Sequence, residues 1–345
     1  MIKALRPMIA VALISACIVH PARSQETAAA TQAPREAAQP QEQAQASVPE
    51  LVTGCDAGDP DSCSQLGDRF REGQGVARNL VQATYLTSKA CHLGDMASCT
   101  TAGFAYGQGA GIALSMERAV AYYGYACSNG DATGCSNLGL AYIRGDGVQK
   151  NEARAAALFN KACEEGSADG CMNLGAAYSL GKGLRRDQAK AARLFKQGCE
   201  ADDEKSCYNL GVLYRDGLGM PRDYGQAAAL FDRSCQADDG SACNNLAMMM
   251  HRGQGRRKDR NGALPIFDRA CRLGEAESCF MIGKAYLEGK EVRNRDNARA
   301  IAFLERSLKL NAQAAFAGRA RRALADACIA EHALCPVNDA RQEEH

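Results

Sequence analysis

The sequence has no tryptophan, only five histidines and no excess of charge of either sign. Its 41 lysines and arginines balance 40 aspartates and glutamates, so the composition gives no sign of a surface for nucleic acid or anionic lipid. No Cys-x-x-Cys pair occurs and the histidines are scattered, which argues against a zinc site. We therefore expect no metal, no cofactor and no nucleic-acid partner.

The motifs of common hydrolases and nucleotide-binding enzymes are also missing. The sequence has no G-x-S-x-G, no H-E-x-x-H and no Walker-type glycine loop. One S-x-x-K, Ser179–Lys182, lacks the S-D-N and K-T-G motifs that accompany it in β-lactamases, and it falls at the end of a predicted helix. Because a match of four residues arises readily by chance, we expect no catalysis.

Cysteine, in contrast, is abundant, with 17 in 345 residues, a density typical of proteins from oxidising compartments. The chain begins with a basic "MIKALR" and an apolar "PMIAVALISACIV" that is too short to span a bilayer. Two processing sites compete. Cleavage after Ser24 would remove a signal peptide of residues 1–24, whereas the lipobox-like "ISAC" would remove 1–16 and lipidate Cys17. Both predict export to the periplasm or the extracellular space. Only lipidation at Cys17 would bring the protein to a membrane, as an outer-membrane lipid anchor.

The remaining chain divides by composition into four parts. Residues 25–50 are rich in Gln, Ala and Pro without an apolar period, which predicts a disordered tether. Residues 51–307 are repetitive, 308–335 have the pattern of an amphipathic C-terminal cap, and 336–345 form a polar tail.

A repeat of 36 residues runs through the repetitive part. The first cysteine of each pair recurs at this interval from Cys55 to Cys271, and the second follows eight residues later each time. Glycine recurs 18 residues after the first cysteine. An aromatic residue recurs 32 residues after it, from Tyr123 to Phe303, with Thr87 as the exception in the first unit.

Each unit predicts two helices. In the third unit, Cys135–Arg144 carries an apolar face, Gly145 supplies a left-handed C-cap, and Asn151 caps a second helix that runs to about Glu164. A Leu-Gly pair recurs within the first helix, where glycine costs about 1 kcal/mol relative to alanine, so we expect a close approach of the neighbouring helix there. The prediction is an all-α fold, an α/α solenoid of about seven units.

The pattern A-x-Y-x-x-G-x-G-V, followed by L-F-x-K-A-C, resembles the Sel1-like repeat family, relatives of the tetratricopeptide repeats. The added C-x7-C is similar to that of the secreted cysteine-rich Helicobacter proteins built from the same repeat. The resemblance implies a solenoid scaffold that binds proteins or peptides. The likeness to the Helicobacter proteins implies an alternative, a β-lactamase or penicillin-binding hydrolase.

The cysteines of such a solenoid could pair at a spacing of eight or of 28 residues. The longer spacing leaves Cys55 and Cys279 without regular partners, whereas the shorter one leaves none over and also accounts for the last two cysteines. Each short disulfide would stabilise the fold by roughly 2–3 kcal/mol. We therefore predict eight local disulfides: Cys55–Cys63, Cys91–Cys99, Cys127–Cys135, Cys163–Cys171, Cys199–Cys207, Cys235–Cys243, Cys271–Cys279 and Cys328–Cys335.

Two sets of residues are candidates for binding. Asparagine recurs ten residues after the first cysteine, where it could bind the backbone of an extended peptide or serve a structural role between units. The loops within units are basic and the turns between units acidic, which predicts two oppositely charged edges. The candidates are Asn137, Asn173, Asn209 and Asn245 for a peptide backbone, and Arg256, Arg257 and Lys258 for an acidic partner.

Overall fold

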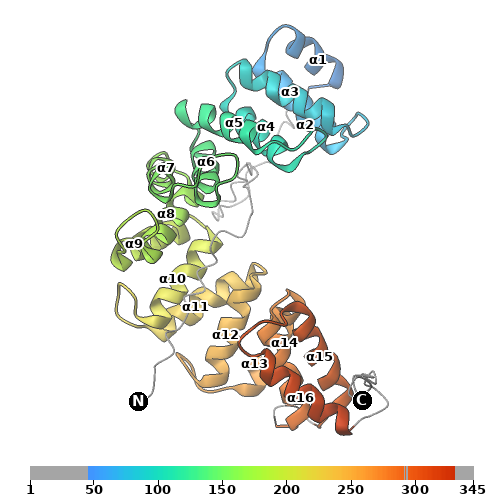
Figure 1. Ribbon diagram of the computed structural model, residues 1–345, viewed down its shortest axis with the longest axis vertical. Helices are drawn as coiled ribbons and strands as arrows, with labels where there is room; N and C mark the ends of the chain where they lie inside the picture. The colour runs from blue at the N-terminus through green and yellow to red at the C-terminus, as the bar shows by residue number, and fades with distance from the viewer. Residues whose placement is uncertain (1–45, 291, 293, 331–345) are drawn as a thin grey trace, which may run out of the picture. The chain divides into compact units, whose positions relative to one another are not determined.

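The computed structural model describes residues 46–290, 292 and 294–330 (Figure 1). Every regular element in this part of the chain is an α-helix. The predicted signal peptide, Cys17, the tether up to residue 45 and the tail lie outside the described residues. The helices are α1 (Val48–Asp56), α2 (Pro60–Glu72), α3 (Leu80–His92), α4 (Met96–Gln108), α5 (Met116–Ser128), α6 (Ala132–Arg144), α7 (Glu152–Glu164), α8 (Ala168–Leu180), α9 (Gln188–Glu200), α10 (Glu204–Asp216), α11 (Tyr224–Gln236), α12 (Gly240–Arg252), α13 (Arg260–Arg272), α14 (Ala276–Glu288), α15 (Asn297–Leu310) and α16 (Ala317–Ala330).

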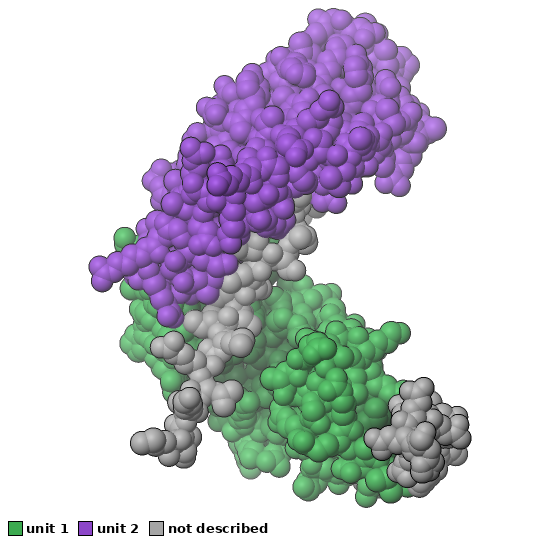
Figure 2. Space-filling view, viewed as in Figure 1, with its two compact units in different colours: residues 1–12, 188–345 green, residues 13–187 purple. Residues whose placement is uncertain are grey.

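These helices belong to two compact units (Figure 2). The N-terminal unit holds the described part of residues 13–187, with α1 to α8, and the C-terminal unit that of 188–345, with α9 to α16. Within each unit consecutive helices pack on one another, and in the N-terminal unit α6 also contacts α4 and α8. This arrangement confirms the predicted α/α solenoid. Over the described ranges, none of the helices has the length and hydropathy needed to cross a membrane.

The predicted helix signals act where the sequence places them. Gly145 ends α6 in the left-handed conformation, at φ 82°, and Asn151 caps α7 by accepting a hydrogen bond from the backbone N–H of Arg154. Helix α6 begins at Ala132, three residues before the predicted start, because Asp131 caps it through the N–H of Gly134. The helix pair of the third unit is therefore confirmed, with a longer first helix.

The glycine within the first helix of a unit lies against the large side chain of the second. A Cβ atom built on Gly139 would stand 2.5 Å from Cε1 of Phe159, a side chain that is 1% exposed. Gly103 meets Tyr123 in the same way, at 2.7 Å from its Cε1. The close helix approach expected from the sequence is thus confirmed, and the absence of a side chain makes room for the ring.

Seven disulfides join the helices at the turns between successive 36-residue repeats. Each links the end of one helix to the start of the next, from α1–α2 to α13–α14, and all seven have a separation of eight residues in sequence. They are the predicted pairs Cys55–Cys63, Cys91–Cys99, Cys127–Cys135, Cys163–Cys171, Cys199–Cys207, Cys235–Cys243 and Cys271–Cys279. The eighth predicted pair, Cys328–Cys335, includes Cys335, which lies outside the described residues.

The last repeat departs from the register that the sequence suggests. Asp296 caps α15 one residue later than a strict repeat of Asp259 would place it, so the preceding loop is one residue longer. Leu304, which is fully buried, therefore lies against Gly283, whereas Phe303 is only partly buried. Phe303 was the expected equivalent of the buried aromatics, and this correction follows from the longer loop.

The two ends of the helical array also differ from the predicted boundaries. Helix α1 begins at Val48, inside the predicted tether, and α15 continues to Leu310, inside the predicted cap. Helix α16 packs on α14 and α15, and Phe316 at its start stacks on Phe280 with ring centroids 5.6 Å apart. This contact covers the exposed side of the last helix pair.

Candidate binding surface

The predicted row of asparagines is mostly buried. Asn137, Asn173 and Asn209 have exposures of 2%, 7% and 2%. Each lies on the first helix of its repeat, and α6, which carries Asn137, packs on α4 and α5 of the preceding repeat. The expectation of an exposed row of amides is corrected for these three residues, because a peptide on the surface cannot reach them. The amide atoms of Asn137 and Asn209 have no hydrogen-bond partner among the described residues.

Asn245 is the exception, because it lines a cavity. Its Nδ2 donates to the backbone carbonyl of Ser241 at 2.9 Å and to the Tyr208 hydroxyl at 3.3 Å, and its Oδ1 accepts from Arg215. The phenol of Tyr208 is buried, and this burial raises its pKa to about 12. Arg215 in turn binds Asp216 through two hydrogen bonds of 2.8 Å. The network holds the Asn245 amide in a fixed orientation.

This cavity, hereafter the α10–α12 cavity, measures about 440 Å³. It lies between the end of α10, the start of α11 and the face of α12. Its lining is largely polar, with the methionines of α12 at the base. The residues that line it are Arg215, Asp216, Arg222, Tyr224, Asn244, Asn245, Met248, Met249, Arg252, Gln254 and Glu277.

Two arginines of the cavity have no carboxylate partner within the described residues, namely Arg222 and Arg252. The Arg222 guanidinium lies 5.7 Å from the centroid of the Tyr224 ring and donates to the Tyr224 hydroxyl at 3.4 Å. Arg252 is exposed at the end of α12. A guanidinium presents several N–H donors in a plane, which suits a carboxylate, so the cavity offers two donors for an anionic group.

The basic loop that follows α12 adjoins this cavity. Gly255, at φ 76°, comes so close to the backbone carbonyl of Tyr224 that a side chain would collide with it. The next three residues of the loop, Arg256, Arg257 and Lys258, are exposed and form no ion pair in the part of the chain that the structure describes. The lining also holds the carboxylates of Asp216 and Glu277, so that Arg222, Arg252 and this loop give the region an excess of positive charge.

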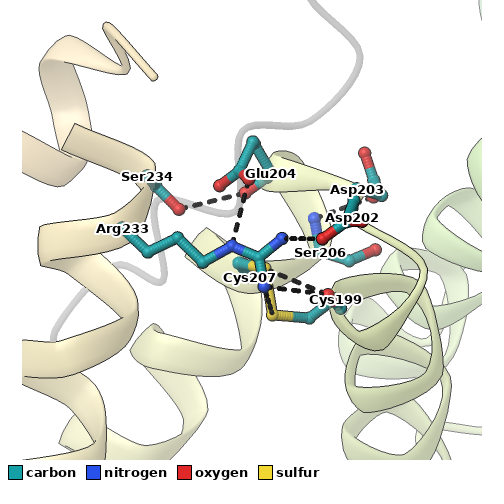
Figure 3. Close-up of a disulfide and its surroundings, with 8 residues drawn as sticks. All are labelled: Cys199, Asp202, Asp203, Glu204, Ser206, Cys207, Arg233 and Ser234. Atoms are coloured by element: carbon teal, nitrogen blue, oxygen red, sulfur yellow. Dashed lines mark hydrogen bonds and ion pairs between the residues drawn. A yellow bond between two sulfur atoms is a disulfide. The ribbon is translucent and has the colours of Figure 1, made fainter. Parts of the chain in front are cut away.

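The acidic residues in the turns between repeats form contacts within the fold. Arg233 of α11 reaches back to the turn between α9 and α10, where its Nη2 lies 2.7 Å from Oδ1 of Asp202 (Figure 3). Its Nε lies 3.1 Å from Oε1 of Glu204, and Nη1 donates to the carbonyl of Cys199 beside the disulfide. One repeat later, Arg269 of α13 binds Asp238, in the turn between α11 and α12, in the same way.

Other acidic residues of these turns cap helices. A carboxylate accepts a hydrogen bond from a first-turn N–H in each case, which stabilises the helix start. At Asp59, hydrogen bonds from the Ser62 hydroxyl and N–H lower the pKa of the carboxyl. The capping residues are Asp59, Asp95, Asp131, Asp203 and Asp239. The expected acidic edge therefore serves mainly structural contacts.

The S-x-x-K motif gains no support from its surroundings. Ser179 is fully buried near the end of α8, whereas an acylated serine must face the substrate. Lys182 follows in the loop after Gly181, which ends the helix. The described ranges also contain no group of three or more His, Cys, Asp or Glu residues placed to hold a metal ion.

The sequence identified only part of this region. Asn245 and the loop of Arg256, Arg257 and Lys258 were expected, but Arg222 and Arg252 were not singled out together. Their proximity depends on the packing of α12 against α10 and α11, which no local pattern reports. The 36-residue period does predict where Arg252 lies, because Arg252, like Arg144, is the last residue before the glycine that ends the first helix of its repeat.

Comparison with protein families identifies seven consecutive Sel1 repeats. They match residues 60–95, 99–131, 132–167, 168–203, 204–239, 240–275 and 276–311, which is well over half of the chain. Each match from α2 to α15 holds one helix pair, and the disulfides lie at the borders between matches. No protein of curated function matches the chain.

The solved structures that are similar to the chain include two proteins of this kind. A protective antigen of uropathogenic Escherichia coli with an SLR fold is 24% identical with a TM-score of 0.71, over 81% of this chain and 59% of its own length. A Sel1 repeat protein of Oxalobacter formigenes is 25% identical with a TM-score of 0.60, over 65% of this chain and 89% of its own. The chain thus spans less than two thirds of the first protein, and that likeness supports the fold alone.

Proposed function

We propose that this protein, which belongs to the Sel1 repeat family, is a non-catalytic scaffold that binds acidic segments of partner proteins or peptides outside the cytoplasm. The observation that carries the proposal is the α10–α12 cavity, where Arg222 and Arg252 stand without carboxylate partners beside the loop of Arg256, Arg257 and Lys258. An acidic side chain or a terminal carboxylate would enter the cavity, and further acidic residues would lie along the loop. Charge complementarity of this kind speeds association and selects partners.

The location is supported by the cysteines. Seven disulfides in one chain need an oxidising compartment to form and persist, which favours the periplasm or the extracellular space. We propose export through the N-terminal segment, with cleavage after Ser24 or lipidation at Cys17. The intact mass of the mature protein tests this, because it reports the cleavage site, any lipid and the two hydrogens lost per disulfide.

Peptide binding can be tested by fluorescence anisotropy. The probe is a labelled peptide of alternating glutamate and serine, and its control is the same peptide with glutamine in place of glutamate. The acidic peptide should bind the protein, and added salt should weaken binding because it screens exposed charges. The neutral peptide should bind much more weakly.

A matched pair of variants then locates the site. Arg222→Ala with Arg252→Ala should weaken binding by about tenfold or more, because each arginine supplies a charge-assisted hydrogen bond. Arg193→Ala with Arg322→Ala removes the same charge from exposed positions on α9 and α16, and should leave the affinity nearly unchanged. Equal losses in both double variants would reduce the interaction to net charge and contradict the site.

The alternative of β-lactam hydrolysis has a direct readout. We expect no turnover of nitrocefin and no acylation by labelled penicillin. Hydrolysis that disappears in Ser179→Ala would overturn the assignment of a non-catalytic role.

A further inference from the structure

The first repeat lacks the large buried side chain that the following repeats share. At the eighth residue of the second helix, five successive repeats place an aromatic ring that is at most 2% exposed. These rings belong to Tyr123, Phe159, Phe195, Phe231 and Phe267. The first repeat has Thr87 at this position, which is smaller than any of these rings.

The glycine against which the ring packs is nevertheless retained. In the second repeat, a Cβ on Gly103 would stand 2.7 Å from Cε1 of Tyr123, and one on Gly107 would stand 3.9 Å from its hydroxyl. The first repeat keeps the equivalent of the first glycine, Gly67, where a Cβ would meet no ring, but the Cγ2 methyl of Thr87 at 3.0 Å. Arg71 stands at the equivalent of Gly107.

A cavity of about 210 Å³ opens at this place between α3 and α4. Ala83, Thr87 and Arg71 line it. The half-buried ring of Phe104 forms part of its wall. The cavity therefore lies beside Thr87, the position at which the following repeats place a ring.

The polar groups within the cavity are already satisfied. The Thr87 hydroxyl donates to the carbonyls of Ala83 and Thr84, and the Thr84 hydroxyl donates to the carbonyl of Ala110 at 3.1 Å. With both hydroxyls bonded to the backbone, the two threonines offer methyl groups to a ligand. The interior thus favours an apolar group rather than a polar one.

Two arginines lie at the cavity, and one of them has no carboxylate partner in the part of the chain that the structure describes. Arg71 forms an ion pair of 2.9 Å with Asp68. Arg78 donates from Nε to the carbonyl of Arg71 at 3.1 Å and has no carboxylate partner in the described part of the chain. A ligand that places a ring inside would therefore bring a carboxylate next to a free guanidinium edge.

We propose that this cavity binds the C-terminal aromatic residue of a peptide, with the ring against Thr87 and Phe104 and the terminal carboxylate on Arg78. The site lies in the N-terminal unit, apart from the α10–α12 cavity. It rests on the proposed function only in that the ligand is a peptide. The two sites are tested with different probes and variants, so that either can fail alone.

The experiment follows the threonine methyl signals of the full chain by NMR, with N-acetyl-L-phenylalanine as the probe. The signals of Thr84, Thr87 and Thr101, which line the cavity, should shift in a saturable manner. N-acetyl-L-alanine, which lacks the ring, should leave them unchanged. N-acetyl-L-phenylalanine amide, which lacks the charge, should bind about tenfold more weakly, as expected for the loss of one charge-assisted contact.

Filling the cavity supplies the decisive variant. Thr87→Phe restores the ring that Phe159 provides above Gly139, so it should raise the melting temperature and abolish the probe shifts. Thr87→Val, which keeps the size of the side chain, should preserve them. Should Thr87→Phe fail to fold, Thr84→Leu takes its place, because Leu264 occupies the equivalent position in a later repeat.

The proposal is overturned by any of three results. The first is that the methyl signals do not change at saturating probe. The second is that Thr87→Phe, or Thr84→Leu in its place, binds the probe as well as the unaltered protein does. The third is that N-acetyl-L-phenylalanine and its amide bind with equal affinity. Loss of acidic-peptide binding in Arg222→Ala with Arg252→Ala leaves these signals unaffected, which separates the two sites.

Discussion

The sharpest prediction concerns two glycines that differ only in what surrounds them. Gly139 lies in the middle of α6, where a Cβ atom would stand 2.5 Å from Cε1 and 2.8 Å from Cδ1 of Phe159. Gly124 lies in the middle of α5, and nothing stands within 4 Å of its Cβ position. The variants Gly139→Ala and Gly124→Ala therefore add the same methyl group to a tight and to an open environment.

The magnitudes follow from two opposing contributions. Alanine improves the helix propensity of either position by about 1 kcal/mol. At Gly139 the methyl also overpacks the core, which costs about 1–3 kcal/mol when the neighbour cannot move. Phe159 is 1% exposed. We expect Gly124→Ala to be stabilised, and Gly139→Ala to be less stable than Gly124→Ala by about 1–3 kcal/mol.

The assay is guanidinium unfolding of both variants with the disulfides intact. Hydrogen exchange of α6 and α7 supplies a local measure, because repeat arrays transmit stability mainly between neighbouring repeats. Equal stabilisation of the two variants would refute the reasoning, since it would mean that the ring does not require a bare helix surface.

Three further predictions concern the disulfides, the ion pairs and the tyrosines. Replacing Cys163 and Cys171 together by alanine should lower the free energy of unfolding by roughly 2–3 kcal/mol, measured with guanidinium. An unchanged unfolding midpoint would show that the disulfide does not stabilise this turn. A double-mutant cycle of Arg233→Met and Glu204→Gln should give a coupling of about 0.2–1 kcal/mol that salt removes, because both side chains are partly exposed. Burial raises the pKa of Tyr208 to about 12 and raises that of Tyr123 as well. The fold thus favours the protonated phenols, so their contribution to stability is complete below about pH 10 and is lost as the pH rises toward the folded-state value. Absorbance during alkaline titration should show that two of the 11 tyrosines ionise at higher pH than the others. One of these two transitions should be absent in Tyr208→Phe. Titration of all eleven phenols over the same pH range would contradict this.

Most of the fold follows from the period because each helix signal recurs with it. Gly145 and Asn151 act as the predicted C-cap and N-cap, and the pairing of Cys55 with Cys63 follows from the need to leave no end cysteine over. The exception is the last repeat. The added loop residue moves the buried position from Phe303 to Leu304, and a strict count of residues cannot detect an insertion that changes no neighbouring motif.

The binding surface was harder to predict. The spacing of Asn137, Asn173 and Asn209 shows that they share a helix face, but not that this face is buried in the fold. The charge of Arg222 and Arg252 is visible in the sequence, but their lack of carboxylate partners is a property of the packed helices.

Hydrogen exchange of the full chain with and without the acidic peptide tests the central proposal most directly. The account predicts protection of the α10–α11 loop around Arg222 and of α12 with its following loop, residues 244–259, and no change in helices α3 and α7 of the N-terminal unit. Protection confined to the N-terminal unit, or none at saturating peptide, would contradict the assignment of the α10–α12 cavity as the binding site.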